Sequence, residues 1–377
     1  MARSSSTSRH SGAAPRAGAN VHAVILAGGA GERFWPASRR HHPKPFLQVV
    51  GGKSLLAATL ERARHFAPPE RTWIVCGSEH ASAVRRAAGL PRGHVLVEPR
   101  RRNTALACAW ASHVIAERDA DAVVAVLPAD HHIPDARAFA RDVRAAAAAA
   151  ACEGVLVTLG VVPTRPDTGY GYIQVGAPVG PAHPRLRRVA RFVEKPDAAR
   201  ARRYLRGGRH LWNAGVFVWR AEALLGEVEV CAPDLHRALA PLRGASARGR
   251  AAIEATYRRA PSLPVDVAVL ERSRRVWTLP VDFHWSDVGT WASLAAELGV
   301  DARAGVAGNR VVAGDVLCDG AAGNLVWGDR RLIALLGVEG LAVVDTGDVI
   351  LVTRLERSAD VRRLVAELGR RGRADLT

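Results

Sequence analysis

The chain has 377 residues, of which 48% are hydrophobic and 24% are charged. A chain of this length and composition can bury a large core, and it predicts one large domain and a smaller one. No apolar run approaches the roughly 20 residues needed to cross a bilayer, so we expect no membrane partner. Residues 1–20 lack the apolar segment of a secretory signal, and we expect a disordered tail there, with a targeting peptide as the less favoured alternative.

The formal net charge of +17 raises the question of nucleic-acid binding, because a basic surface attracts polyphosphates. The arginines are nevertheless scattered over RRVARF, RRYLRGGR, ERSRRV and RRGR, without interleaved aromatic residues or zinc-finger spacing. This pattern favours a solvated arginine-rich surface and no nucleic-acid partner.

Five cysteines are far apart in the sequence and include no CxxC pair: Cys76, Cys108, Cys152, Cys231 and Cys318. An odd number at these spacings favours reduced, mostly buried thiols over a disulfide framework or a zinc site. We therefore predict a cytoplasmic protein.

Short apolar, β-branched segments alternate with helix-favouring segments in the first part of the chain. Such alternation at βαβ spacing predicts a mostly parallel, Rossmann-like α/β sheet with helices on both faces, whose ligands gather beyond the carboxyl ends of the strands. The expected strands are 21–28, 71–76, 94–98 and 121–128, and the expected helices are 54–66, 103–118 and 136–151.

From about residue 154 the pattern changes to strand-like pieces such as GVLVTLGVV, YGYIQVG and WNAGVFVW, which we expect to extend the same sheet. One domain is therefore predicted over 21–296. After residue 300, short segments rich in Val, Leu and Gly recur between turns, which predicts a small C-terminal β domain over 297–377 closed by a helix in SADVRRLVAELGRR. A left-handed β-helix is one candidate for it, although the repeat is irregular.

A glycine loop follows the first expected strand in LAGGAGERF, at Gly28, Gly29 and Gly31. Glycines in such a loop allow a tight turn and let main-chain N–H groups form an anion-binding nest. The pattern is neither GxGxxG nor a Walker loop, and an ordinary strand-to-turn connection is the alternative. Arg33 lies just past the loop, where a guanidinium can grip a triphosphate.

Lysine is scarce: only Lys44, Lys53 and Lys195 occur among the 53 basic residues. Lys44 lies between two prolines in PKPF, and Lys195 follows Glu194 in FVEKPD. A compact ammonium suits phosphate binding in a way that the planar guanidinium does not, so we expect both lysines to handle phosphate. Glu194 would accept hydrogen bonds from sugar hydroxyls. An exposed loop lysine and a surface ion pair are the alternatives.

Isolated aspartates follow apolar segments at Asp130 in LPADHHI and Asp287 in HWSDVGTW. Carboxylates at such positions suit metal binding, with a solvated loop aspartate as the alternative for each. A phosphate cradle, point charges and metal carboxylates together indicate a nucleotidyl transfer site.

Eight motifs in order resemble the mannose-1-phosphate guanylyltransferase branch of the sugar-phosphate nucleotidyltransferase family, over residues 22 to about 296. The strings GLAVVDTGDVILV and SADVRRLV also resemble the C-terminal portion of the family. FWPASR and RNT favour the guanylyltransferase branch over thymidylyl- and uridylyltransferases. The eight motifs are LAGGAGERFWPASR, PKPFL, EPRRRNTA, LPADHHI, GYGYI, FVEKPD, WNAGVF and SDVGTW.

This resemblance implies a nucleotide-diphospho-sugar transferase fold and transfer of GMP from GTP to α-D-mannose 1-phosphate, giving GDP-mannose and pyrophosphate. It implies Mg²⁺ as the cofactor and a homodimer as a possible assembly. It assigns Gly28, Gly29 and Gly31 to the nucleotide phosphates, Arg33 and Lys44 to the triphosphate and departing pyrophosphate, Asn103 and Thr104 to the base and ribose, Asp130 and Asp287 to Mg²⁺, and Gly171, Glu194, Lys195 and Asn213 to the sugar phosphate.

Three positions depart from the family pattern: Leu106 where proline is common, Ala214 where serine is common and Val267 where tyrosine is frequent. None of them removes a charged group that the reaction needs. They leave open a nucleotidylyltransferase for another sugar 1-phosphate. A catalytically silent regulatory paralogue is a further alternative, and the presence of Arg33, Lys44, Asp130 and Asp287 argues against it.

Overall fold

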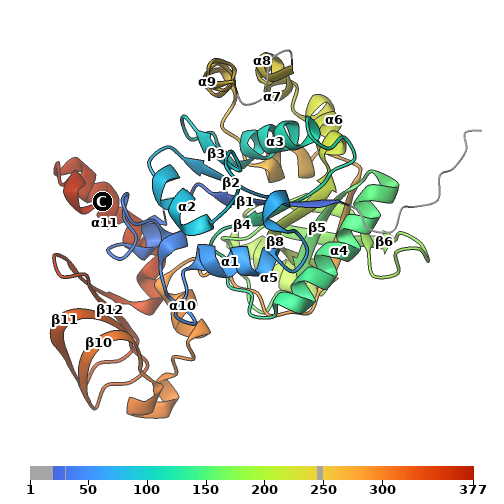
Figure 1. Ribbon diagram of the computed structural model, residues 1–377. Coiled ribbons are helices and arrows are strands. Elements are labelled where there is room, and N and C mark those ends of the chain that lie inside the picture. Colours follow the sequence, from blue (N-terminus) through green and yellow to red (C-terminus); the bar gives the residue numbers. More distant parts are fainter. Residues whose placement is uncertain (1–19, 30, 244–248) are drawn as a thin grey trace, which may run out of the picture.

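A computed structural model describes residues 20–29, 31–243 and 249–377, so the tail predicted over 1–20 lies outside the described residues except for Asn20. Among the described residues, nine strands form one mixed sheet (Figure 1). In spatial order the strands are β3 (Val95–Glu98), β2 (Thr72–Gly77), β1 (Val21–Ala27), β4 (Val123–Pro128), β8 (His210–Arg220), β5 (Leu156–Val161), β9 (Val276–Val281), β7 (Arg187–Val193) and β6 (Tyr172–Pro178).

The first four strands run parallel, as predicted, with Ile25 of β1 paired to Ile74 of β2 and to Leu127 of β4. β5 and β9 are also parallel, whereas β8 runs antiparallel to both β4 and β5, and β6 and β7 pair antiparallel. The antiparallel pairing of β6 and β7 follows from their connection, because no helix lies between them to make the crossover that parallel neighbours need. The predicted α/β fold class is confirmed; parallel pairing is found in β3, β2, β1 and β4 and again between β5 and β9, and the other neighbours are antiparallel.

Helices cover both faces of the sheet (Figure 1). Along β1, Ala23 and Ile25 pack in one buried cluster and Val24 in the other, as the period of two in a strand requires. On the first face lie α1 (Leu55–Ala63), α2 (Ala81–Ala88), α4 (Ala136–Glu153) and α5 (Ala198–Gly207); on the second lie α3 (Asn103–Ala116), α6 (Ala221–Cys231), α7 (Pro233–Ala238), α8 (Ala240–Arg243) and α9 (Arg250–Arg259).

Local signals explain where the expected helices begin. The hydroxyl of Ser54 accepts a hydrogen bond from the backbone N–H of Ala57 at 3.2 Å and caps α1. The carboxylate of Asp135 accepts one from the backbone N–H of Ala138 at 2.9 Å and caps α4, whose alanine content gives it high helix propensity.

The C-terminal part is a four-stranded sheet of β10 (Arg310–Asp319), β11 (Leu325–Leu336), β12 (Leu341–Asp345) and β13 (Ile350–Arg354). Arg310 pairs with Leu325 and Leu325 with Ala342, both in parallel, so the chain coils upon itself before β13 returns antiparallel. Buried Asn324 links successive turns: its amide nitrogen donates to the Val338 carbonyl at 3.0 Å and its oxygen accepts from the Leu341 N–H at 2.9 Å. The predicted handedness of this coil stays a prediction.

The two parts share a hydrophobic cluster that includes Phe34, Trp291, Leu325 and Val344. Trp291 begins α10 (Trp291–Glu297), and α11 (Val361–Arg370) closes the chain as expected from its sequence. The indole N–H of Trp35 donates to the carbonyl of Leu376 at 2.7 Å. The C-terminal part therefore packs against the segment after the glycine loop and hydrogen-bonds to it. In the described part of the chain, no helix is both long and apolar enough to cross a membrane.

Candidate active site

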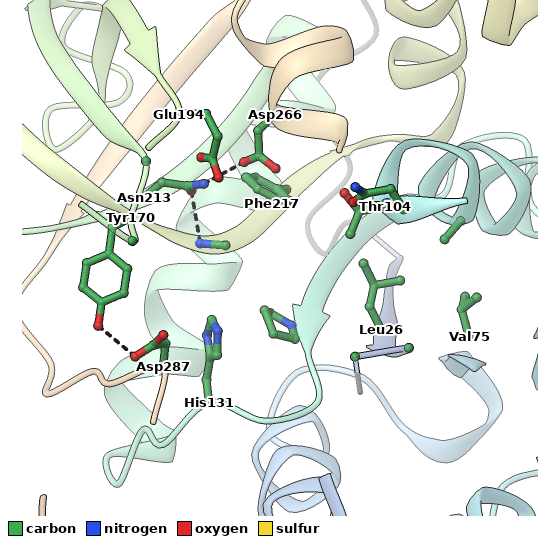
Figure 2. A pocket seen from close by; sticks show the side chains of 18 of the residues that line it. Leu26, Val75, Thr104, His131, Tyr170, Glu194, Asn213, Phe217, Asp266 and Asp287 are labelled. Atoms are coloured by element: carbon green, nitrogen blue, oxygen red, sulfur yellow. Dashed lines mark hydrogen bonds between the residues drawn. The ribbon is translucent and has the colours of Figure 1, made fainter. Parts of the chain in front are cut away.

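A cavity of about 460 Å³ opens where strands β1 to β4 end. Leu26 and Gly28 from the end of β1, Val75 from β2, Glu98 from β3 and Pro128 from β4 all line it. Ligands of open α/β sheets bind outside the carboxyl ends of the strands, so this cavity lies where the sequence pattern predicts a site. Figure 2 shows Leu26 and Val75 on one side of it and Tyr170 and Asp287 on the other.

The glycine loop borders the cavity through Gly28 and Gly29. Gly31 serves another purpose: its φ is 66°, and a Cβ there would lie 2.5 Å from Cβ of Lys44 and 2.7 Å from Oγ of Ser38. Glycine is therefore required at position 31 for the loop to close on Lys44. A Cβ on Gly29 would meet nothing within 4 Å among the described residues, so the space beside Gly29 is open to a ligand.

Lys44 is buried and joins the two aspartates singled out from the sequence. Its Nζ donates to Oδ2 of Asp130 at 2.8 Å and to the backbone carbonyl of Asp287 at 2.7 Å. The short helix Lys44–Phe46, with Pro43 before it and Pro45 within it, fixes the backbone that carries this ammonium. The interpretation of Lys44 as an exposed loop lysine is excluded.

Electrostatics around Asp130 favour its charged form. Burial acts to raise the pKa of Asp130, but the Lys44 ammonium and neighbouring His131 outweigh it and lower that pKa. Burial lowers the pKa of His131 to about 4, so this ring is neutral at pH 7. Buried Arg62 holds the loop by donating to the carbonyls of His131 and Ile133, each at 3.3 Å.

Asp287 lies on the opposite side of Lys44 and faces the second half of the cavity. Its Oδ1 accepts from the hydroxyl of Tyr170 at 2.8 Å and from the N–H of Gly289 at 3.1 Å (Figure 2). Val288 has a φ of 41°, a conformation that a β-branched residue adopts at an energetic cost. The hydrogen bonds of Asp287 to Tyr170, Gly289 and Lys44 hold the turn in this strained conformation.

The oxygen donors around Lys44 fit a divalent cation held jointly with substrate. The ammonium already lies between a carboxylate oxygen of Asp130 and the carbonyl oxygen of Asp287, a position where oxygen ligands stabilise positive charge. No cluster of three or more His, Cys, Asp or Glu side chains in the described ranges is arranged as a complete metal cage. Mg²⁺ commonly uses one or two carboxylates, with waters and phosphate oxygens completing the octahedron.

Polar residues predicted to hold a sugar phosphate meet at the far side of the cavity. The amide oxygen of Asn213 accepts from Thr158 Oγ1 at 3.0 Å, and its amide nitrogen donates to Oδ1 of Asp266 at 2.7 Å (Figure 2). A Cβ on Gly171 would lie 2.6 Å from Oε2 of Glu194 and 3.3 Å from Cβ of Asn213, so Gly171 lies close to both side chains. Asn213, Gly171 and Glu194 all line the cavity.

Asn103 and Thr104 begin α3 at the cavity wall. The Asn103 side chain accepts from the backbone N–H of Thr104 at 2.9 Å, and the Thr104 hydroxyl accepts from the N–H of Val265 at 2.9 Å. Asn103 has a φ of 60°, which asparagine tolerates better than most residues. The helix N-terminus therefore faces the cavity with its orientation set by these contacts.

Five predicted site residues lie outside the cavity lining: Gly31, Arg33, Lys44, Asp130 and Lys195. Arg33 is exposed after the glycine loop. Lys195 is exposed, has a φ of 46°, and pairs with Oε1 of Glu194 at 2.7 Å, which is the surface ion pair that the sequence left as the alternative. The side chains of Arg33 and Lys195 are long enough to turn toward a ligand, and their assignment to phosphate stays a prediction.

Sequence reasoning missed several polar residues of the cavity. Burial and the nearby Glu194 raise the pKa of Asp266 to about 7. Burial raises the pKa of Glu98 to about 7, although the Tyr257 hydroxyl donates to its Oε1 at 3.1 Å. Glu98 ends an apolar strand, a signal that could have identified it; Tyr170 and Asp266 carried no such signal.

A cavity at the carboxyl edge of an α/β sheet, bordered by a glycine loop on one side and by Glu194, Asn213 and Asp287 on the other, is the arrangement expected of an enzyme of the nucleotidyltransferase class. The chain belongs to the nucleotidyl transferase family, whose model matches residues 22–301. A second model, the MannoseP isomerase/GMP-like beta-helix domain, matches residues 315–368 and confirms the β-helix-like character of the C-terminal domain.

Named relatives match most of the chain. The alginate biosynthesis protein AlgA of Pseudomonas aeruginosa is 36% identical, covering 93% of this chain and 73% of the relative. The mannose-1-phosphate guanylyltransferase of Escherichia coli is 37% identical over 93% of this chain and 74% of its own length. A crystal structure from Thermus thermophilus, described as a mannose-1-phosphate geranyltransferase, has a TM-score of 0.83 and 36% identity, covering 93% of this chain and 99% of the other.

Proposed function

We propose that this chain transfers GMP from GTP to α-D-mannose 1-phosphate and releases GDP-mannose and pyrophosphate. Relatives such as the Escherichia coli mannose-1-phosphate guanylyltransferase support this substrate pair. The carrying observation is the contact of Lys44 with Asp130 and with the backbone of Asp287, because it joins the segment after the glycine loop to Asp287, which lines the cavity together with Gly28 and Glu194. We further propose Mg²⁺ as the cofactor and the cytoplasm as the location, and the homodimer remains a prediction.

The reaction needs no general base, because a phosphate oxygen of the sugar ester is already an anionic nucleophile. The chain has to hold that oxygen in line with the α-phosphorus of GTP and to offset the repulsion between two anions. Mg²⁺ bound through Asp130 and Asp287 would supply charge neutralisation and alignment of the phosphates. Lys44, and Arg33 turned inward from the surface, would stabilise the negative charge that develops on pyrophosphate.

The sugar side of the cavity supplies acceptors for hydroxyl groups. Glu194 has a carboxylate at the cavity wall, and Asn213 is held beside it by Thr158 and Asp266. Hydrogen bonds from hydroxyl groups to a carboxylate are strong, so Glu194 would fix the orientation of the sugar ring. Neutral His131 and the ring of Trp285, which donates to His131 Nδ1 at 3.2 Å, would support the wall without transferring a proton.

The test is direct. Purified full-length protein is incubated with Mg²⁺, each of the four nucleoside triphosphates and a panel of sugar 1-phosphates, while pyrophosphate release and the nucleotide sugar are measured. We expect release with GTP and mannose 1-phosphate above all other pairs. A preference for another hexose 1-phosphate would replace the proposed acceptor, and no release with any pair would support a catalytically silent paralogue.

A further inference from the structure

Glu98 lines the cavity together with Asn103 and Thr104, and the proposed chemistry gives its carboxylate no role. It is the last residue of β3, it is 7% exposed, and it lines the cavity with Leu26, Val75 and Ala107. Figure 2 shows Leu26, Val75 and Thr104 grouped away from Tyr170 and Asp287. Apolar walls beside a helix N-terminus suit a flat heterocyclic base, whose faces are apolar and whose edge is polar.

The carboxylate of Glu98 is held by one neutral donor and no salt bridge in the described ranges. The Tyr257 hydroxyl donates to Oε1 at 3.1 Å, while a Cβ on Gly28 would lie 3.4 Å from Oε2, so Oε2 faces the glycine loop. Nearby Arg101 donates instead to Oε1 of Glu79 at 2.7 Å, and Arg102 donates to the Tyr257 carbonyl at 2.9 Å. A buried carboxyl without a cationic partner is costly to keep, which points to a ligand that uses it.

Among the common bases, guanine has an edge that matches a carboxylate best. Its N1–H and 2-amino group are two adjacent donors, and a carboxylate offers two parallel acceptors. Adenine presents an unprotonated ring nitrogen at the same edge, cytosine does likewise, and uracil has a single N–H between two carbonyl oxygens. A carboxylate in this position therefore attracts guanine and leaves a lone-pair conflict with adenine or cytosine.

We propose that Glu98 selects guanine, its carboxylate accepting hydrogen bonds from N1–H and the 2-amino group, with the Tyr257 hydroxyl holding that carboxylate in place. This assignment rests on the proposed use of GTP. It makes Glu98 a specificity-determining residue at the base end of the cavity, separate from the cation site at Asp130 and Asp287. Binding gives two further donors to a carboxylate that has one neutral donor, the Tyr257 hydroxyl, among the described residues, so the affinity gained is specific to this base.

The test compares GTP with ITP, which keeps N1–H and lacks the 2-amino group. For the wild type we expect kcat/KM with GTP to exceed that with ITP by about tenfold, the value of one hydrogen bond to a charged group. Glu98→Gln should lower kcat/KM for GTP by roughly 10- to 100-fold and bring the GTP/ITP ratio toward one. Glu61→Gln, the same change at an exposed carboxylate paired with Lys53, should leave both values unchanged.

Calorimetry of GDP and IDP binding measures the same preference without turnover. Tyr257→Phe is a second variant for the case that Glu98→Gln does not fold. Tyr257→Phe should lower the GTP/ITP ratio severalfold. A wild-type GTP/ITP ratio in both variants would overturn the assignment while the proposed function stands. A wild-type enzyme that prefers ATP or UTP to GTP would overturn both the proposed nucleotide and the role of Glu98.

Discussion

Nζ of Lys44 lies 2.8 Å from Oδ2 of Asp130, although 86 positions separate the two residues in the chain. The contact places a positive charge between the end of β4 and the loop of Asp287, whose carbonyl accepts from the same ammonium at 2.7 Å. Because the stem of Lys44 packs on Gly31, the glycine loop and the contact between Lys44 and Asp130 form one unit. Changes to either residue should therefore affect phosphate chemistry more than folding.

Lys44→Arg should lower kcat by roughly 100-fold, because a planar guanidinium cannot replace a compact ammonium in a position closed by Gly31 on one side. Steady-state rates with GTP and mannose 1-phosphate measure the effect. Lys53→Arg is the matched control, since Lys53 is exposed and pairs only with Glu61 among the described residues, and its rate should equal that of the wild type. Equal rates for the two variants would remove Lys44 from the phosphate site.

Asp287→Asn should reduce turnover by about 1,000-fold, because it removes the charge expected to hold Mg²⁺ while keeping the shape of the side chain. Tyr170→Phe removes only the hydroxyl that donates to Asp287 at 2.8 Å, so its loss should be much smaller, near tenfold. Rates measured across a Mg²⁺ titration distinguish the two variants. We expect only Asp287→Asn to need a higher Mg²⁺ concentration for its half-maximal rate. Near-normal activity of Asp287→Asn at ordinary Mg²⁺ would exclude Asp287 as a ligand.

Gly31→Ala and Gly29→Ala should have different consequences. At position 31 the new Cβ would occupy a left-handed conformation and press on Lys44, costing about 2 kcal/mol of unfolding free energy as well as activity. At position 29 the new Cβ would enter open space beside the cavity. The unfolding midpoint of Gly29→Ala should therefore equal that of the wild type, while its KM for GTP rises. Denaturant unfolding together with kinetics checks both, and equal destabilisation of the two variants would contradict this distinction.

Stability should depend on pH through Glu98. Its pKa in the folded chain is raised to about 7, because burial and nearby Glu79 outweigh the Tyr257 hydroxyl and Arg101. The folded state therefore keeps a proton that the unfolded state releases above its ordinary pKa of 4.5, so this contribution to stability is lost as pH rises from about 4.5 to about 7.

Glu98→Gln has no such ionisation and should be more stable than the wild type at pH 8 by up to roughly 3 kcal/mol, with a smaller difference at pH 5. Urea unfolding at the two pH values measures this difference. An equal difference in unfolding free energy between the two proteins at pH 5 and pH 8 would show that Glu98 does not titrate between these pH values.

The local pattern of apolar and polar residues in the sequence predicted much of the fold. The run 21–28 became β1, the alanine-rich run 136–151 became α4, and the recurring Val and Leu segments after 300 became stacked strands, because strand and helix periodicity are set by which neighbouring side chains must be buried. The motifs also identified Gly28, Asn103, Glu194 and Asp287, all of which line the cavity.

The sequence by itself determined the strands, most helices, the family and the charged residues available for phosphate chemistry, since these follow from local burial patterns and short motifs. Only the tertiary structure decided that Lys44 is buried against Asp130, that Lys195 is exposed beside Glu194, and that Glu98 is a buried carboxyl group in the cavity lining. Contacts between residues far apart in the chain depend on how the sheet and its loops pack, and neither residue of such a pair carries that information alone.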